Sequence, residues 1–62
     1  MYVCQMYSCF NSFGSLNDLL DFFKNLPYLQ QIGTTLFDYE KNAYAEGKDF
    51  AFNKELKWRN MP

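Results

Sequence analysis

The chain has 62 residues, a formal net charge of −1 and a high share of aromatic residues, namely seven Phe, five Tyr and one Trp. It has no His and two Cys, so it lacks the residues for a four-ligand zinc site or a histidine-based triad. The near-balance of charge argues against a basic nucleic-acid clamp and against a highly acidic DNA mimic. A hydrophobic content of 48% argues against disorder, and the length predicts a single domain over residues 1–62.

The first segment, Tyr2 to Phe10, is rich in aromatic, β-branched and sulfur-containing residues, which predicts a strand with one buried face. The first residues lack the basic segment and the unbroken apolar core of a secretory signal, and no run of about 20 apolar residues follows. We therefore expect a cytoplasmic protein without a membrane span (host cytoplasm, if phage-encoded). Cys4 and Cys9 would lie on opposite faces of this strand, too far apart for a disulfide, so we expect two reduced thiols that pack as small apolar residues.

The middle of the chain predicts an amphipathic helix. Ser15 is a typical N-cap residue, and Asp18 follows three residues later in a capping-box position. Apolar side chains then recur at helical spacing and form one stripe, Leu16, Leu19, Leu20, Phe23 and Leu26. Pro27 ends or kinks this helix and can begin a short second turn to Ile32, which Gly33 would end as a left-handed cap.

From Thr34 the period of the apolar residues changes to two, which predicts two strands within 34–58 that fold about Glu46-Gly47. In that register Phe37 lies opposite Leu56. The tail after Asn53 is also compatible with a short helix that Asn53 would cap. The complete pattern predicts a small α+β domain of β-α-β-β order, with one amphipathic helix packed on a three-stranded, mainly antiparallel sheet.

One helix cannot cover both faces of such a sheet, so part of the aromatic surface is expected to stay exposed. Exposed aromatic side chains are typical of protein interfaces. The candidate interface residues are Tyr7, Phe22, Tyr28, Tyr44 and Trp58.

The polar face of the predicted hairpin supplies a second candidate surface. Asp38 and Glu40 would share one side with Asp49 and Glu55, with Asp38 roughly opposite Glu55. Like charges placed opposite each other are mildly destabilising, so this acidic stripe is a candidate contact for a basic partner. A solvated outer face of the sheet is the alternative explanation.

Residues that carry catalytic chemistry are scarce. Without His, acid–base catalysis would need a perturbed side chain in a sheltered pocket, and the sequence has no GxGxxG, phosphate loop or metal-ligand spacing. We expect no enzyme, no metal and no cofactor. Lys54, Lys57 and Arg59 flank Trp58, and such a group suits single-stranded nucleic acid, which is the alternative function. The cations are few, so that binding would be weak and salt-sensitive.

We therefore expect a non-catalytic protein-binding module that acts stoichiometrically on a protein target. In length and composition alone, the chain resembles the small proteins with which phages and other mobile elements block host enzymes or defence complexes, such as anti-CRISPR and anti-restriction proteins. This resemblance implies an inhibitor, and a small assembly subunit of a larger complex is a further alternative. A homodimer is expected, formed by edge pairing of the first strand or by packing of the uncovered sheet face.

Overall fold

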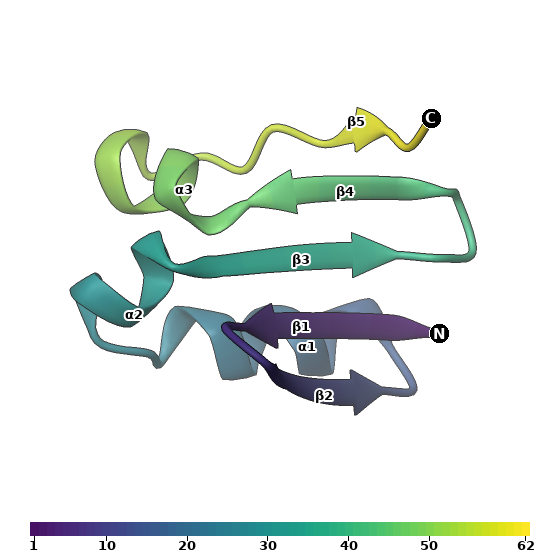
Figure 1. The fold of residues 1–62 in the computed structure, drawn as a ribbon, viewed down its shortest axis with the longest axis horizontal. Coiled ribbons are helices and arrows are strands. Elements are labelled where there is room, and N and C mark those ends of the chain that lie inside the picture. Colours follow the sequence, from purple (N-terminus) through teal and green to yellow (C-terminus); the bar gives the residue numbers. More distant parts are fainter.

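In the computed structural model, which describes residues Met1–Pro62, five strands form one antiparallel sheet in the order β2-β1-β3-β4-β5 (Figure 1). The strands are β1 (Tyr2–Met6), β2 (Cys9–Phe13), β3 (Thr34–Asp38), β4 (Ala43–Glu46) and β5 (Arg59–Asn60). The helices are α1 (Leu16–Lys24), α2 (Tyr28–Ile32) and α3 (Gly47–Asn53).

The helices leave one face of the sheet free. Helix α1 lies behind β1 and β2, whereas α2 and α3 lie together at one end of the sheet (Figure 1). Both chain termini lie at the opposite end. The predicted α+β class is confirmed, but the sheet has five strands instead of three, and three helices replace the single one expected. No helix has the length and apolarity needed to cross a membrane.

The first segment is a hairpin instead of the single strand expected from Tyr2 to Phe10. The chain reverses at Tyr7 and Ser8, and β2 pairs antiparallel with β1. Tyr7 has a φ of 57°, a backbone region that Gly and Asn usually occupy, so its residue type did not indicate a turn. Strand β1 is thereby enclosed between β2 and β3 and has no edge free for the expected dimer pairing, and only the part of the predicted strand that belongs to β2 lies at an edge of the sheet.

Helix α1 forms as predicted. The Ser15 hydroxyl accepts a hydrogen bond from the backbone N–H of Asp18 at 3.2 Å and caps the helix. The apolar stripe of α1 faces the sheet, where Leu19 and Phe23 are completely buried. Together with residues of the sheet, they form the core, whose members are Cys4, Leu19, Phe23, Leu36 and Ala45.

A buried amide fixes α2 to the end of α1. The Gln31 Nε2 donates to the carbonyl oxygens of Phe23 at 3.3 Å and Lys24 at 3.5 Å, in the last turn of α1. The Phe23 carbonyl also accepts from the backbone N–H of Leu26 at 3.1 Å, so Gln31 adds a second donor there and supplies a partner to Lys24, at the end of a helix whose last carbonyls lack intrahelical donors. The helix begins after Pro27, as predicted, but Gly33 ends it with a φ of −88°, so the expected left-handed cap is wrong.

The second hairpin turns at residues 39–42, between β3 and β4, and not at Glu46-Gly47. The Asp38 Oδ1 accepts hydrogen bonds from the backbone N–H groups of Glu40 and Lys41, both at 3.1 Å, which closes the turn. Asn42 then adopts a φ of 55°. Asp and Asn both stabilise tight turns, so the sequence did contain a turn signal here. The prediction placed the turn at Glu46-Gly47 instead.

Gly47 is the first residue of α3, and its role is close packing. A Cβ at this position would collide with the carbonyl oxygen of Gln31 and lie 2.8 Å from the Phe23 ring. Only glycine lets α3 approach α2 and α1 this closely. The absent side chain therefore marks a contact between helices, which one sequence cannot distinguish from a turn.

The tail joins the sheet only at its end. Asn53 is the last residue of α3 and does not cap a further helix. The chain is irregular over 54–58 and then adds β5 to the outer edge of β4. Phe37 consequently lies opposite Tyr44, and the expected pairing with Leu56 is wrong.

Candidate protein-binding surfaces

The prediction that aromatic side chains stay exposed is confirmed. Phe23 is the one completely buried aromatic residue. Six of the thirteen rings are exposed, namely Tyr7, Phe10, Tyr28, Tyr39, Phe52 and Trp58. The remaining six are half-buried at the margin of the core or on the open face of the sheet.

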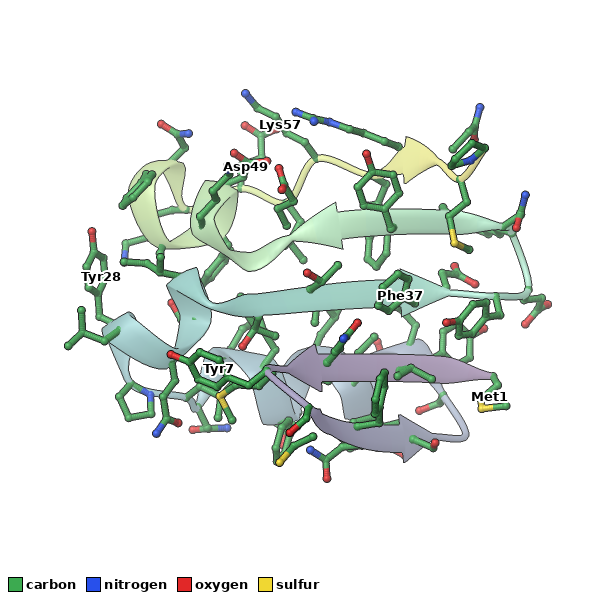
Figure 2. All side chains as sticks on the ribbon, in the orientation of Figure 1. Met1, Tyr7, Tyr28, Phe37, Asp49 and Lys57 are labelled. Atoms are coloured by element: carbon green, nitrogen blue, oxygen red, sulfur yellow. The ribbon has the colours of Figure 1, made fainter.

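Four exposed apolar side chains lie at the end of the sheet that carries α2 and α3. We call this group the end patch, and it consists of Tyr7, Tyr28, Leu29 and Phe52. Their exposed fractions run from 51% for Tyr28 to 80% for Tyr7. The Tyr28 and Phe52 ring centroids are 6.3 Å apart, and Figure 2 shows Tyr7 and Tyr28 at the same end of the molecule.

Local structure explains why these side chains point outward. Gln31 is the residue of α2 that faces α1, and Leu29, two residues earlier, lies on nearly the opposite side of that short helix. Tyr28 is the first residue of α2 and is exposed at its start. Phe52 projects from α3 on the side away from Phe50, whose ring packs edge-on against the core at 5.4 Å from Phe23. Two helices thus present apolar side chains on the same end of the fold.

Tyr7 joins the end patch from the β1–β2 turn. Its ring lies beside Gly33, the residue that follows α2, and a Cβ added to Gly33 would be 3.5 Å from the Tyr7 hydroxyl oxygen. The side chain nevertheless remains the most exposed aromatic residue of the chain. A bulky residue at positive φ is strained by about 1 kcal/mol or more, so the turn carries this ring at a cost in stability.

The open face of the sheet is a second surface. By register it carries alternate residues of each strand, namely Val3, Gln5, Phe10, Ser12, Thr35, Phe37, Tyr44, Glu46 and Arg59. Phe37 projects from β3 on this face (Figure 2). Its ring is stacked with that of Tyr39 at 5.6 Å and an interplanar angle of 5°. Phe10 is 64% exposed at the outer strand, β2.

The predicted interface aromatics do not gather on one surface. Tyr7 and Tyr28 belong to the end patch, whereas Tyr44 is half-buried on the open face. Phe22 is half-buried on α1 and packs against Phe13 at 5.3 Å. Trp58 lies in the irregular segment before β5 and is 37% exposed.

The expected acidic stripe does not form. Asp38 is buried on the helix-covered face, where it closes the 39–42 turn. Glu40 lies in that turn, and its Oε2 accepts a hydrogen bond from the Tyr2 hydroxyl at 2.8 Å. Asp49 lies in α3 and Glu55 in the irregular segment, so neither is opposite Asp38. The changed hairpin register separates these carboxylates.

The basic residues of the alternative nucleic-acid site are dispersed or already paired. Arg59 lies 3.9 Å from Glu46 and 4.0 Å from Asp49, so carboxylates neutralise the cation on the open face. The Lys54 Nζ lies 6.0 Å from the centroid of the Phe50 ring. Lys57 precedes Trp58 in the exposed irregular segment.

Neither cysteine belongs to a cluster of side chains suited to catalysis. Cys4 is buried in the core, and burial raises the pKa of its thiol. Cys9 is exposed on β2, and both are free thiols. No pocket opens into the fold, and no three His, Cys, Asp or Glu side chains lie close enough to hold a metal ion.

Sequence reasoning missed Leu29 and Phe52, which complete the end patch. Leu29 follows Pro27 in a helix too short to show an apolar period. Phe52 was assigned to a strand, on which it would share a face with Phe50. Residues two apart lie on nearly opposite sides of a helix, so on a helix Phe50 could face the core while Phe52 faces outward. That spacing was the available signal for an exposed Phe52.

No family model matches the chain, and no curated protein or solved structure is found to be similar to it.

Proposed function

We propose that the chain is a non-catalytic protein-binding module that acts stoichiometrically, with the end patch as its contact surface. The observation that carries this proposal is the grouping of four large, exposed, uncharged side chains from three separate elements at one end of the fold. Tyr28 and Phe52 are of the aromatic type enriched in interface cores. A contiguous apolar patch on a small protein usually marks a binding site.

The strained turn supports the same proposal. Glycine would fit the backbone of residue 7 without strain, yet the chain has a tyrosine there, and its ring is exposed. Nothing in the core needs that ring, because Tyr7 is outside the core cluster and its margin. Strain at an exposed side chain is expected where the side chain serves binding.

Occlusion of a cleft is the mode of action that we propose. The molecule measures only 26 × 22 × 19 Å, and Tyr7 and Tyr28 of the end patch lie at one end of it (Figure 2). Such an end fits a concave surface, such as the active-site cleft of a host enzyme or a channel in a defence complex. We propose an inhibitor that acts in this way in the cytoplasm, where Cys4 and Cys9 would stay reduced.

The first experiment measures whether binding depends on the end patch. The immobilised chain and a Leu29→Ser/Phe52→Ser variant are exposed to host lysate, and retained proteins are quantified by mass spectrometry. We expect the target to be retained at least about tenfold less by the variant, because apolar anchors dominate interface energy. Lys57→Ser, a change at an exposed site in the irregular segment, is the matched control and should retain the target fully. Equal retention by all three proteins would refute the proposal.

The second experiment uses the strain at residue 7. Tyr7→Gly should raise the free energy of unfolding by up to about 1 kcal/mol, because the turn is relaxed, and should weaken target binding, because a ring is lost. Urea unfolding and titration calorimetry with the captured target measure the two effects. A stabilised variant with unchanged affinity would remove Tyr7 from the contact surface.

Single-stranded nucleic acid is the second candidate, and the observation that favours it is the set of aromatic side chains on the open face. Phe37, Tyr39 and Phe10 offer ring faces on which bases stack. The pairing of Arg59 with two carboxylates weakens the candidate. Titration of a labelled oligonucleotide at low salt and at about 200 mM salt decides, since micromolar binding with a steep salt dependence would favour nucleic acid. A small assembly subunit would instead be captured as part of a stable complex.

A further inference from the structure

The two edges of the sheet differ in how well they are protected. Strand β5 has two residues, and Lys57, Arg59 and Pro62 lie in or beside it. Short length, basic side chains and proline are features that keep other strands from pairing with an edge. Strand β2 has five residues, Cys9–Phe13, with no charge and no proline. In Figure 1 it forms the outer edge of the sheet.

The backbone of β2 has hydrogen-bonding groups free for a partner strand. A two-residue turn closes the β1–β2 hairpin next to the pair Met6↔Cys9. Because hydrogen-bonded pairs alternate along an antiparallel ladder, Cys9, Asn11 and Phe13 direct their N–H and C=O groups toward β1. Phe10 and Ser12 direct theirs outward.

We propose that β2 is a dimer interface, to which a second copy of the chain adds its own β2 antiparallel, with the two-fold axis beside Asn11. The two sheets then form one continuous sheet of ten strands. The arrangement is closed, since each copy uses its unprotected edge and exposes only β5. The interface shares no residue with the end patch, although Tyr7 lies in the turn that precedes β2, so it does not depend on the proposed function.

Strand β2 is complementary to itself about this axis. Phe10 lies opposite Ser12 of the second copy, so a large side chain meets a small one on the open face. Cys9 lies opposite Phe13 of the second copy on the other face, again small against large. The two Asn11 side chains meet at the axis, where each amide can donate to and accept from the other. The outward groups of Phe10 and Ser12 form the intermolecular ladder.

Charge also favours a second copy. No charged side chain occurs before Asp18, so two β2 edges approach without repulsion between like charges. Phe10 is 64% exposed, and in the dimer its ring lies diagonally across from Phe10 of the second copy, within reach of contact. The half-buried pair Phe13 and Phe22 lies beside the same edge and gains cover. The open faces of the two sheets become one surface.

Disulfide trapping tests the register. At the axis the two Asn11 residues form a non-hydrogen-bonded pair, whose Cα separation of about 4.5 Å suits a disulfide. In a Cys9→Ser background, Asn11→Cys should yield mostly covalent dimer on mild oxidation. Ser12→Cys in the same background is the matched control and should yield little, because the two copies of residue 12 lie about 7–8 Å apart. An Asn11→Cys yield no higher than the control overturns the proposal.

Sedimentation equilibrium tests the interface itself. The wild-type protein should show about twice the 7.4 kDa mass of one chain. Ser12→Pro should raise the dissociation constant by at least about tenfold, because proline removes an outward donor that β1 does not use. Circular dichroism at low concentration should show that this variant remains folded. A wild-type mass of one chain at every soluble concentration, or a Ser12→Pro dimer of unchanged affinity, overturns the proposal.

The same measurement separates this interface from the end patch. Leu29→Ser/Phe52→Ser should leave the dimer mass unchanged, even if it abolishes target binding. Loss of the dimer in that variant would show that the end patch joins the copies, and would overturn the β2 interface. A monomeric wild type that loses a captured protein on Ser12→Pro would show that β2 pairs with a strand of another protein instead.

Discussion

The two faces of the sheet are built from different residues. The helix-covered face uses small and aliphatic side chains, such as Cys4, Leu36 and Ala45, which α1 buries completely or nearly so. The open face combines polar side chains with the rings of Phe10, Phe37 and Tyr44, and with no helix above it Val3 is still only 6% exposed. Val3 lies directly opposite Phe37. Large rings on neighbouring strands thus shield an apolar residue where a layer of helices would otherwise do so.

This difference accounts for part of the unusual aromatic content. The half-buried rings of Phe37 and Tyr44 shield a sheet face that the short chain cannot cover with helices. Phe10 and the rings of the end patch shield little and are themselves exposed. The binding proposals therefore rest on these residues and not on the total number of rings.

The largest expected effect on stability comes from the close contact of Gly47 with Gln31 and Phe23. Gly47→Ala places a Cβ against the backbone of Gln31, which cannot move aside, so we expect a loss of about 3 kcal/mol or more, enough to unfold much of the protein. Gly33→Ala is the control, because its Cβ meets Tyr7 at an ordinary 3.5 Å and its φ is negative. Urea unfolding of both variants measures the difference. Comparable stability would mean that α2 and α3 are not packed this closely.

Adjacent residues of β3 test the two faces directly. Leu36→Ala should cost about 2–5 kcal/mol of unfolding free energy, because it leaves a cavity between the sheet and α1. Phe37→Ala should cost about 1–2 kcal/mol, since its ring is half-buried and water can fill the space. Chemical denaturation followed by circular dichroism gives both values. Equal losses would contradict the contrast between the faces.

The reaction rates of the two thiols should differ between the centre of the helix-covered face, where Cys4 lies, and its edge, where Cys9 lies. Cys9 should react with iodoacetamide at neutral pH, whereas Cys4 should react at least about tenfold more slowly, because it is buried and burial raises the pKa of its thiol. Mass spectrometry of timed samples gives the rates, and urea should make them equal. Fast labelling of Cys4 in the native protein would show that the core opens readily.

The smallest expected effect lies at the rim of the covered face. The hydrogen bond that the Tyr2 hydroxyl donates to Glu40 raises the pKa of Tyr2 above its ordinary value near 10. The folded state therefore holds this proton more tightly, and the stabilisation is complete below pH 10 and lost as pH rises through the folded pKa. Tyr2→Phe should lessen the alkaline fall in the unfolding midpoint. An identical alkaline profile would show that the bond is not formed in solution.

The elements predicted correctly are those with local causes. The Ser15 cap and the apolar stripe specify α1 within a dozen residues, and the period of two specifies β3. The missed turn at Tyr7 has no such local cause, because tyrosine rarely adopts a positive φ. The chain turns there because the whole fold is more stable that way than its alternatives.

The missed helix α3 has a different cause. Alternation around Phe50 and Phe52 fits a strand, but Gly47 allows a helical turn to dock closely on Gln31, and that contact comes from a distant part of the chain. The end patch also depends on contacts between distant parts of the chain. Tyr7 and Tyr28 could be selected as large rings, whereas their grouping with Phe52 required the arrangement of α2 and α3.

Both ends of the polypeptide emerge on the side remote from α2 and α3 (Figure 1). A fluorescent protein, an affinity handle or a neighbouring module fused to Met1 or Pro62 would therefore point away from Tyr28 and Leu29. Two such chains could also be joined tail to head by a flexible linker without masking either tip. The fold thus lends itself to display on a carrier, with its apolar end directed outward.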